Sequence, residues 1–361
     1  MEAEQIYGPD AAIPSPFTKA SYRRAFRRFL RYLDMEGKQA ALLQQDHKII
    51  ESQIIGYIHF LSETKHYGHY SLATPLSSIF HFYEMNDILL NKRKITRFIP
   101  QDDSETEADN AATQKDRAYT HEEIQQILHS LDYRSEVMIL LMASTGMRLG
   151  SLVGLRIGHL TKIKVKEYNL YKILVYATSR KNRYYTFCTP ECAKAIDSYL
   201  EFRKRFGDPL RPTEPLIREQ FDINDKFAGQ NPRALTHRTY EHIVNGILRK
   251  SGLKTKEVAR THGFRKFAIT QMIKAKLDFS TREFLVGHRV SRGLDVNYDR
   301  TTEEDRLSEY LKAVDLLTIN PENRLRLKIQ EMQSEHSAEW NQLKEEMSGL
   351  KDILKRLNQK V

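Results

Sequence analysis

The chain has 361 residues, of which 40% are hydrophobic and 29% charged, so it can form two folded domains. Lys and Arg number 57 against 47 Asp and Glu; the net charge of +10 favours a polyanionic partner such as nucleic acid, although a generic basic protein fits it equally well. No run reaches the roughly 18 apolar residues of a membrane span, and the acidic N-terminus lacks the apolar core of a secretory signal.

The N-terminal domain, residues 1–99, is predicted to be a small helical bundle. Residues 16–33 carry apolar residues at helical spacing, with five arginines on the remaining surface. A solvated basic face would explain the arginines, but we favour a helix along DNA phosphates because aromatic residues interleave with them so densely. Two further helices are predicted at 48–63 and 72–84, without strand-like alternation. The candidate DNA-contacting residues are Arg23, Arg24, Arg27 and Arg28.

A linker and a second domain are predicted next. Residues 100–117 are acidic and polar without apolar periodicity, which is typical of a linker. The second domain, 118–320, opens on a capping box formed by Thr120 and Glu123. Segments rich in Tyr, Val, Ile and Thr flank a polar tip at 180–182, which predicts a β-hairpin among helices. The predicted fold class is therefore mainly α with a small antiparallel β-sheet (α+β).

Residues 321–361 are predicted to form a C-terminal helix. From residue 322 the chain has no proline, and its apolar residues step alternately by four and three, most regularly from Trp340 onward. We favour a self-associating coiled coil. The alternative is a helix packed against its own or a neighbouring catalytic domain.

Two arginines stand out in the second domain. Arg148 interrupts a small, apolar run just after Gly146, and Arg265 follows His262 by three residues at the start of another amphipathic run. Either arginine alone is more often structural and paired with a carboxylate. Together, two guanidinium groups and a helix N-terminus suit a phosphate, because the planar guanidinium fork can bind two phosphate oxygens.

A histidine and a tyrosine follow in the polar stretch after the predicted helix 280–286. His288 comes directly after Gly287, and Tyr298 lies ten residues further on in "DVNYDR". A phenol with a pKa near 10 is barely ionised at neutral pH, so it needs a base or positive charge to become a nucleophile. The two arginines and the histidines would supply both.

Taken together, these residues resemble the tyrosine recombinase/integrase family, with a catalytic domain of the phage integrase or Xer kind. "ASTGMRLGSLVGLR" is similar to the family's first-arginine segment, and "HGFR", "GH" and the tyrosine follow in the family's order. The resemblance covers roughly residues 120–315, and the N-terminal bundle is similar to the family's core-binding domain. It implies a lysine on the hairpin. Lys181 is the candidate, with Arg180 and Arg183 as competitors that could instead contact DNA, as could Lys181 itself.

The resemblance implies a site-specific recombinase or integrase of a mobile genetic element, which cuts and rejoins DNA through a 3′-phosphotyrosyl intermediate. It implies a homotetramer on two DNA duplexes, in the cytoplasm and associated with DNA, or in the nucleus of a eukaryotic host. A type IB topoisomerase and a non-catalytic DNA-binding protein of the same fold are the alternatives. The implied catalytic residues are Arg148, Lys181, His262, Arg265, His288 and Tyr298.

No metal or other cofactor is expected. The chain has two cysteines, Cys188 and Cys192, and no other cysteine to complete a metal-binding set with them. The chain shows no glycine-rich phosphate-binding motif of the ATP-dependent kind. A reducing, intracellular setting fits this cysteine usage.

Overall fold

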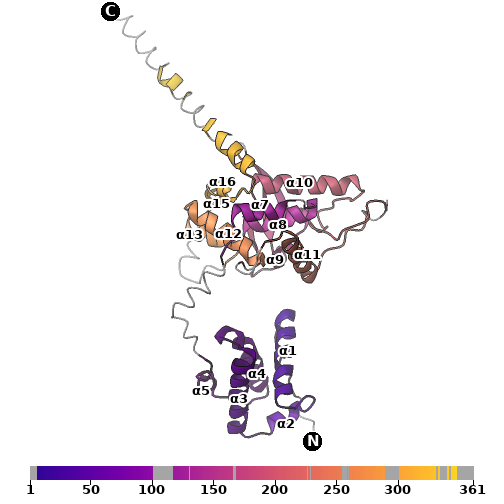
Figure 1. The fold of residues 1–361 in the computed structure, drawn as a ribbon, viewed down its shortest axis with the longest axis vertical. Coiled ribbons are helices and arrows are strands. Elements are labelled where there is room, and N and C mark those ends of the chain that lie inside the picture. Colours follow the sequence, from indigo (N-terminus) through magenta and orange to yellow (C-terminus); the bar gives the residue numbers. More distant parts are fainter. Residues whose placement is uncertain are drawn as a thin grey trace, which may run out of the picture. The chain divides into compact units, whose positions relative to one another are not determined.

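The structure is a computed structural model that divides into two compact units, Met1–Asn110 and Ala111–Val361 (Figure 1). Residues 101–116 of the predicted linker lie outside the part that it describes. Within that part, no helix is long and apolar enough to cross a membrane. The described residues are 6–100, 117–129, 131–165, 168–225, 227, 229–253, 258, 260–288, 301–330, 332–333, 340 and 343–347.

The first unit is helical throughout its described elements. Ser15 caps the first helix through its side chain, and Pro16 occupies the first helical turn, where a missing N–H costs nothing. Phe26 packs against Phe82 with ring centroids 4.4 Å apart, so the first and fourth helices share one aromatic core. The helices are α1 (Pro16–Tyr32), α2 (Gln39–Leu43), α3 (His47–Lys65), α4 (His69–Met85) and α5 (Lys92–Thr96).

The second unit combines helices with one small sheet. The capping box of Thr120 and Glu123 is present at the start of α7, and it makes both reciprocal hydrogen bonds. The helices are α7 (His121–Leu128), α8 (Tyr133–Thr145), α9 (Leu149–Val153), α10 (Pro190–Arg205), α11 (His237–Lys250), α12 (Arg260–Lys274), α13 (Phe279–Leu285), α15 (Glu303–Leu311) and α16 (Val314–Leu317), with a 3-10 turn η1 (Ile157–His159).

The sheet is antiparallel, with the strands in the order β1 (Leu160–Val165), β2 (Tyr168–Val175) and β3 (Tyr184–Phe187). Strands β2 and β3 form the predicted hairpin, with Ile173 opposite Thr186. Strand β1 was not predicted; it adds to the outer side of β2. The predicted fold class, mainly α with a small antiparallel sheet, is confirmed.

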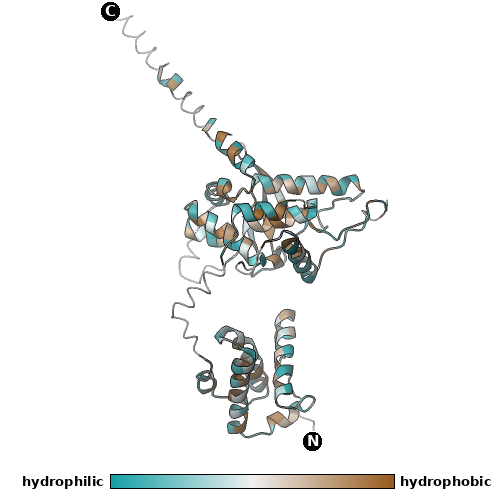
Figure 2. Cartoon of the chain, in the orientation of Figure 1, coloured by the Kyte–Doolittle hydropathy of each residue, from teal (hydrophilic) through white to brown (hydrophobic). Residues whose placement is uncertain are grey.

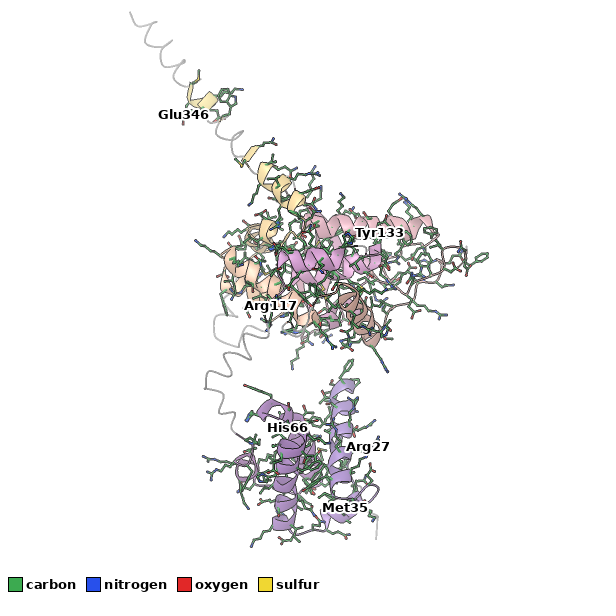
Figure 3. The ribbon with its side chains drawn as sticks, viewed as in Figure 1. Arg27, Met35, His66, Arg117, Tyr133 and Glu346 are labelled. Carbon is green, nitrogen blue, oxygen red and sulfur yellow. The ribbon has the colours of Figure 1, made fainter. Side chains whose placement is uncertain are left out.

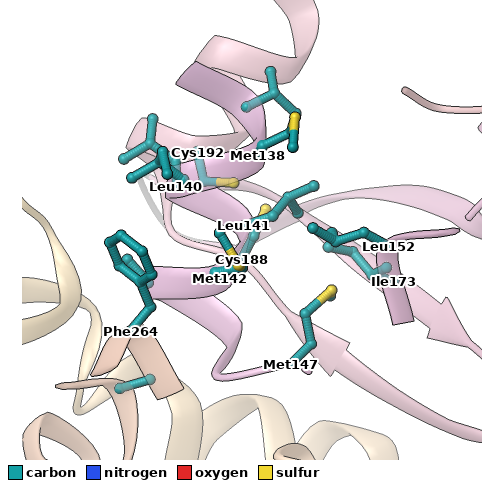
Figure 4. Close-up of a cluster of buried hydrophobic side chains, with 14 of the residues drawn as sticks. Met138, Leu140, Leu141, Met142, Met147, Leu152, Ile173, Cys188, Cys192 and Phe264 are labelled. Carbon is teal, nitrogen blue, oxygen red and sulfur yellow. The ribbon is translucent and has the colours of Figure 1, made fainter. Parts of the chain in front are cut away.

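Helix α8 lies at the centre of the second unit's core. Its residues from Val137 to Thr145 are all buried. Figure 4 shows its Met138, Leu141 and Met142 gathered with Cys188 and Cys192, both of which are reduced and fully buried. Helix α10 instead alternates hydrophilic and hydrophobic residues along its ribbon (Figure 2), as expected for a helix with one buried face. The segment that leads from α8 to Arg148 is therefore held rigidly.

A buried ionic cluster fixes the long connection between α10 and α11. The Asp208 carboxylate accepts hydrogen bonds from Arg203 Nε and Arg218 Nη1, both at 2.9 Å. Arg203 also donates to the carbonyl groups of Pro215 and Leu216, and Arg218 donates to that of Gly229. Two cations thus share one anion, and nearby carbonyl groups of the connection partly compensate the second charge.

Glu191, in the first turn of α10, holds the start of the C-terminal segment on the second unit. Its carboxylate accepts hydrogen bonds from the N–H groups of Ile319 and Asn320, at 2.7 and 3.0 Å, and from the Asn323 side chain. Residues 321–330 are helical. The described apolar side chains of the predicted heptad seam are between 46% and 56% exposed: Ile329, Trp340, Leu343 and Met347.

Candidate active site

The first arginine of the site follows a tight turn at the end of α8. Gly146 adopts a left-handed φ of +65°, and its N–H donates to the Met142 carbonyl, which ends the helix. A Cβ at Gly146 would lie 3.1 Å from Ala268 Cβ and 3.2 Å from Val286 Cγ1, so the turn packs closely against α12 and the end of α13. Arg148 follows at the N-cap of α9, with its side chain exposed.

The second arginine is buried beside that turn. Arg265 on α12 is only 2% exposed, and its Nη1 donates to the Gly146 carbonyl at 2.5 Å. Its Nη2 is also buried and has no hydrogen-bond partner among the described residues, which likewise hold no carboxylate in an ion pair with it. Burial, and then the positive charge of Arg148, lower the pKa of Arg265 to about 10. Arg265 therefore presents a buried charge that only the more distant Glu283 partly offsets among the described residues, and an unused donor, which is what an anion-binding site requires.

A second glycine turn positions His288. Gly287 has φ +67° after α13; its N–H donates to the Phe284 carbonyl, and the His288 N–H donates to the Glu283 carbonyl, both at 2.9 Å. This pair of bonds is a Schellman motif. The His288 Nδ1 lies 2.6 Å from Glu283 Oε2, so Nε2 is the ring nitrogen that remains for a ligand.

The two turns bring Arg148, Arg265 and His288 together. Arg148 Nη1 donates to the Gly287 carbonyl at 3.3 Å, directly before His288. Each arginine is thus oriented by the carbonyl of a left-handed glycine, and the two guanidinium groups are close enough for one to lower the pKa of the other. An anion bound between them would compensate this repulsion, which suits a phosphodiester.

The other predicted residues lie differently. His262 is exposed on the first turn of α12, three residues before Arg265. Lys181, Arg180 and Arg183 are all exposed between β2 and β3, and no contact of Lys181 with Arg148, Arg265 or His288 is present in the structure. Tyr298 lies outside the described residues.

The chain re-enters the described part just after Tyr298, at Thr301. Arg306 of α15 donates to the Thr301 carbonyl at 2.7 Å, and its guanidinium lies 4.3 Å from the centre of the Phe284 ring on α13. Glu303 forms an ion pair with Lys172 of β2 at 2.8 Å. These contacts hold the start of α15 against α13, the helix that leads to His288.

The prediction from sequence missed a cluster of hydroxyl groups in the site. The Ser151 hydroxyl on α9 donates to Tyr176 Oη at 3.0 Å, and the Tyr176 and Tyr184 ring centroids are 6.3 Å apart. Tyr184 packs on Gly287, where an added Cβ would meet its ring at 2.5 Å. Burial raises the pKa of Tyr184 to about 12, although Ser151 and Arg265 act in the opposite direction. The chain has 18 tyrosines, so sequence alone did not distinguish these two.

The predicted basic face of α1 is present in the first unit. Arg23, Arg24, Arg27 and Arg28 line a shallow hollow of about 470 Å³ together with Arg31, and Figure 3 shows Arg27 on this helix. Arg23 forms an ion pair with Asp10 at 2.7 Å, and Arg28 donates to the Tyr67 hydroxyl. DNA binding by this face stays a prediction. Replacing these arginines should reduce the slope of log affinity against log salt concentration, and the reduction would measure how many phosphates the face contacts.

Comparison with known proteins places these features in context. The family model described as the phage integrase family matches residues 117–304. The tyrosine recombinase XerC of Anoxybacillus flavithermus is 24% identical over 311 residues, which cover 83% of this chain and 92% of that protein. No cluster of three or more His, Cys, Asp or Glu side chains in the described part could hold a metal ion.

Two solved structures of the XerH site-specific recombinase have a similar fold. One is a post-cleavage complex with a palindromic difH substrate, at 15% identity and a TM-score of 0.51, covering 81% of this chain and 79% of that one. The other is a pre-cleavage complex with difH, at 16% identity and a TM-score of 0.50, covering 81% and 78%. At these identities the likeness concerns the fold.

Proposed function

The chain belongs to the phage integrase family of tyrosine recombinases, and we propose that it is a site-specific recombinase or integrase of a mobile genetic element, cutting and rejoining duplex DNA. The observation that supports this best is the pairing of Arg148 with Arg265 at two glycine turns. Arg265 holds a buried charge that forms no ion pair with a carboxylate in the described part of the chain, and a phosphodiester is the anion that this arrangement fits.

In the proposed reaction, the Tyr298 oxygen attacks the phosphorus, the bond to the 5′-oxygen breaks, and a 3′-phosphotyrosyl ester forms. Arg148 and Arg265 bind the non-bridging oxygens, whose negative charge grows in the transition state. His262 accepts the tyrosine proton, and His288 donates a hydrogen bond to the phosphate through Nε2. The resemblance assigns protonation of the leaving 5′-oxygen to Lys181. The ester conserves the bond energy, so another 5′-hydroxyl can reverse the attack and rejoin the strands.

The test is to trap and map the covalent intermediate. The substrate is a pool of nicked duplexes of randomised sequence, in which cleavage releases a short 5′-hydroxyl fragment that cannot be rejoined. We expect protein–DNA complexes that survive denaturation, and peptide mapping that assigns the DNA to Tyr298. The Tyr298→Phe variant, which keeps the ring and loses the hydroxyl, is the control. A wild-type protein that binds DNA without any covalent complex would leave only the non-catalytic DNA-binding protein.

The proposed assembly is a tetramer on two duplexes, stabilised by association of the C-terminal tails. The uncovered apolar side chains of Trp340, Leu343 and Met347 support this, since each is more than half exposed in the single chain. A chain that ends after Asn320 keeps the hydrogen bonds of Glu191 to Ile319 and Asn320. We expect this truncated chain to form smaller complexes on DNA than the full chain, as measured by sizing with light scattering. Unchanged complexes would contradict a role for the tail in assembly.

A further inference from the structure

The proposed cleavage needs a proton donor for the leaving 5′-oxygen, and the hairpin between β2 and β3 offers two acids. Lys181 is exposed at its tip and touches neither arginine of the site. Tyr176 stands at its base, directly after β2, and its side chain is half-buried. Position alone therefore favours Tyr176, which lies at the site itself.

The backbone at Tyr176 is strained. Its φ of +50° lies in the left-handed region, which a bulky aromatic residue rarely adopts. The Ser179 N–H donates to the Tyr176 carbonyl at 2.9 Å and closes the turn in this conformation. Strain of this kind persists only where the surroundings impose it, and it is concentrated at functional sites.

The Tyr176 hydroxyl is held against α9, the short helix that Arg148 caps. Its oxygen lies 3.0 Å from Ser151 Oγ, and Ser151 is three residues after Arg148 in the same short helix, where its N–H donates to the Arg148 carbonyl. The phenol also acts electrostatically on Arg265. Because Ser151 donates in this hydrogen bond, the proton of Tyr176 stays available for another acceptor. The neighbouring Tyr184 is 8% exposed and is covered by Gly287, so a DNA strand reaches Tyr176 more readily.

We propose that Tyr176, not Lys181, donates the proton to the leaving 5′-oxygen. This rests on the proposed recombinase function. As the Tyr298 oxygen bonds to phosphorus, the electron pair of the breaking P–O bond goes to the 5′-oxygen, which takes the Tyr176 proton. Arg265, with which the Tyr176 phenol interacts electrostatically, stabilises the resulting phenolate. In rejoining, the same phenolate accepts the proton of the attacking 5′-hydroxyl.

The chemistry of a phenol suits this step. Phenol and ammonium groups have similar reference pKa values of about 10, so tyrosine can replace lysine as a general acid. If the leaving group needs no proton, a residue that acts as general acid is no longer needed for cleavage. A residue with a merely structural role would still be needed.

The test compares two substrates that differ in one atom. Both are the duplex recovered by covalent trapping, one with the natural bridging 5′-oxygen and one with sulfur, which leaves as a thiolate without protonation because a thiol pKa is only about 8.5. We expect Tyr176→Phe to slow cleavage of the oxygen substrate by about 100-fold or more, and to cleave the sulfur substrate at nearly the wild-type rate. The rate on sulfur also proves that the variant is folded.

Matched variants complete the test. Tyr185→Phe removes the next phenol of the same hairpin, whose hydroxyl accepts a 3.3 Å hydrogen bond from Arg306, and should cleave both substrates like the wild type. Lys181→Ala should slow cleavage of the oxygen substrate and of the sulfur substrate by the same factor. The proposal is overturned if Tyr176→Phe cleaves the oxygen substrate normally, if its loss persists on sulfur, or if sulfur rescues Lys181→Ala. Failure of the recombinase function is distinct, because the wild type would then form no adduct with either substrate.

Discussion

Replacing Arg265 by Gln is expected to slow formation of the covalent protein–DNA complex by about 100- to 1,000-fold, while the free protein unfolds at an unchanged or higher temperature. The catalytic loss follows from removing a preorganised cation where charge develops in the transition state. The unusual part is stability, since a large buried side chain normally costs stability when it is shortened.

The sign of the stability effect follows from the pKa of Arg265. Burial, together with the charge of Arg148, lowers this pKa from 12.5 to about 10 in the folded protein. Between these two pH values the unfolded chain binds a proton that the folded chain has lost, so the free energy of unfolding rises with pH there. At neutral pH the charge of Arg265 therefore opposes folding, by an amount on the order of 3 kcal/mol. Removing it offsets the lost contact with the Gly146 carbonyl.

Two measurements check this prediction: the rate of adduct formation on the nicked duplex, and the midpoint of thermal unfolding without DNA. Arg203→Gln is the matched control, because Arg203 is equally buried but paired with Asp208, and its loss should lower the midpoint. A similar drop in both variants, with adduct formation intact in Arg265→Gln, would show that Arg265 is structural. Added phosphate should raise the midpoint of the wild type more than that of Arg265→Gln.

The start of α7 and the β2–β3 hairpin of the second unit were predictable because the residue patterns that indicate them are local in the sequence. Thr120 and Glu123 form a capping box within four residues, and the polar tip of the β2–β3 hairpin lies between two strand-like segments. Strand β1 escaped prediction because it is an edge strand with exposed Lys162 and Lys164. Its identity comes from pairing with β2, where Ile163 lies opposite Leu170. Tertiary pairing of this kind leaves little trace in a six-residue sequence.

The charged residues of the site could be predicted from the sequence, but the hydrogen bonds that orient them could not. Arg148 and Arg265 stood out because each interrupts an apolar pattern, and the structure brings them together. What orients them is the carbonyl groups of Gly146 and Gly287, which are backbone atoms that no side-chain pattern reveals. Tyr176 is the clearest case: its conformation and its contact with Ser151 depend on how the hairpin meets α9.

The largest loss of stability is expected from Asp208→Ala. Asp208 is buried between Arg203 and Arg218, so its removal leaves Arg203 enclosed without its counter-ion and takes one ion-pair partner from Arg218. Losing one partner of a buried ion pair typically costs about 3–5 kcal/mol. For a unit of this size that corresponds to roughly 10 °C in the unfolding midpoint.

The pH dependence of the same cluster has a defined direction. Burial tends to raise the pKa of Asp208, but the hydrogen bonds and charge of Arg203 outweigh it, so the pKa is lowered. A carboxylate whose pKa is lowered on folding stabilises the protein above its unfolded value, about 3.9, and this contribution is lost as the pH falls through the folded value. Protonation of Asp208 should therefore contribute to the acid unfolding of the wild type, and this contribution should be absent from the acid unfolding of Asp208→Ala.

Calorimetry of four variants separates the cluster from an ordinary surface pair. Glu201→Ala removes the partner of Arg205 in a pair whose side chains are 73% and 56% exposed, and it should change the free energy of unfolding by less than about 1 kcal/mol. The double variant with both Arg203→Gln and Asp208→Ala should lose less free energy of unfolding than the two single variants lose in sum. The reason is that Arg203→Gln removes a cation that Asp208→Ala leaves without its carboxylate. Additive losses would mean that the three side chains are energetically independent, and the connection between α10 and α11 would then owe its order to other contacts.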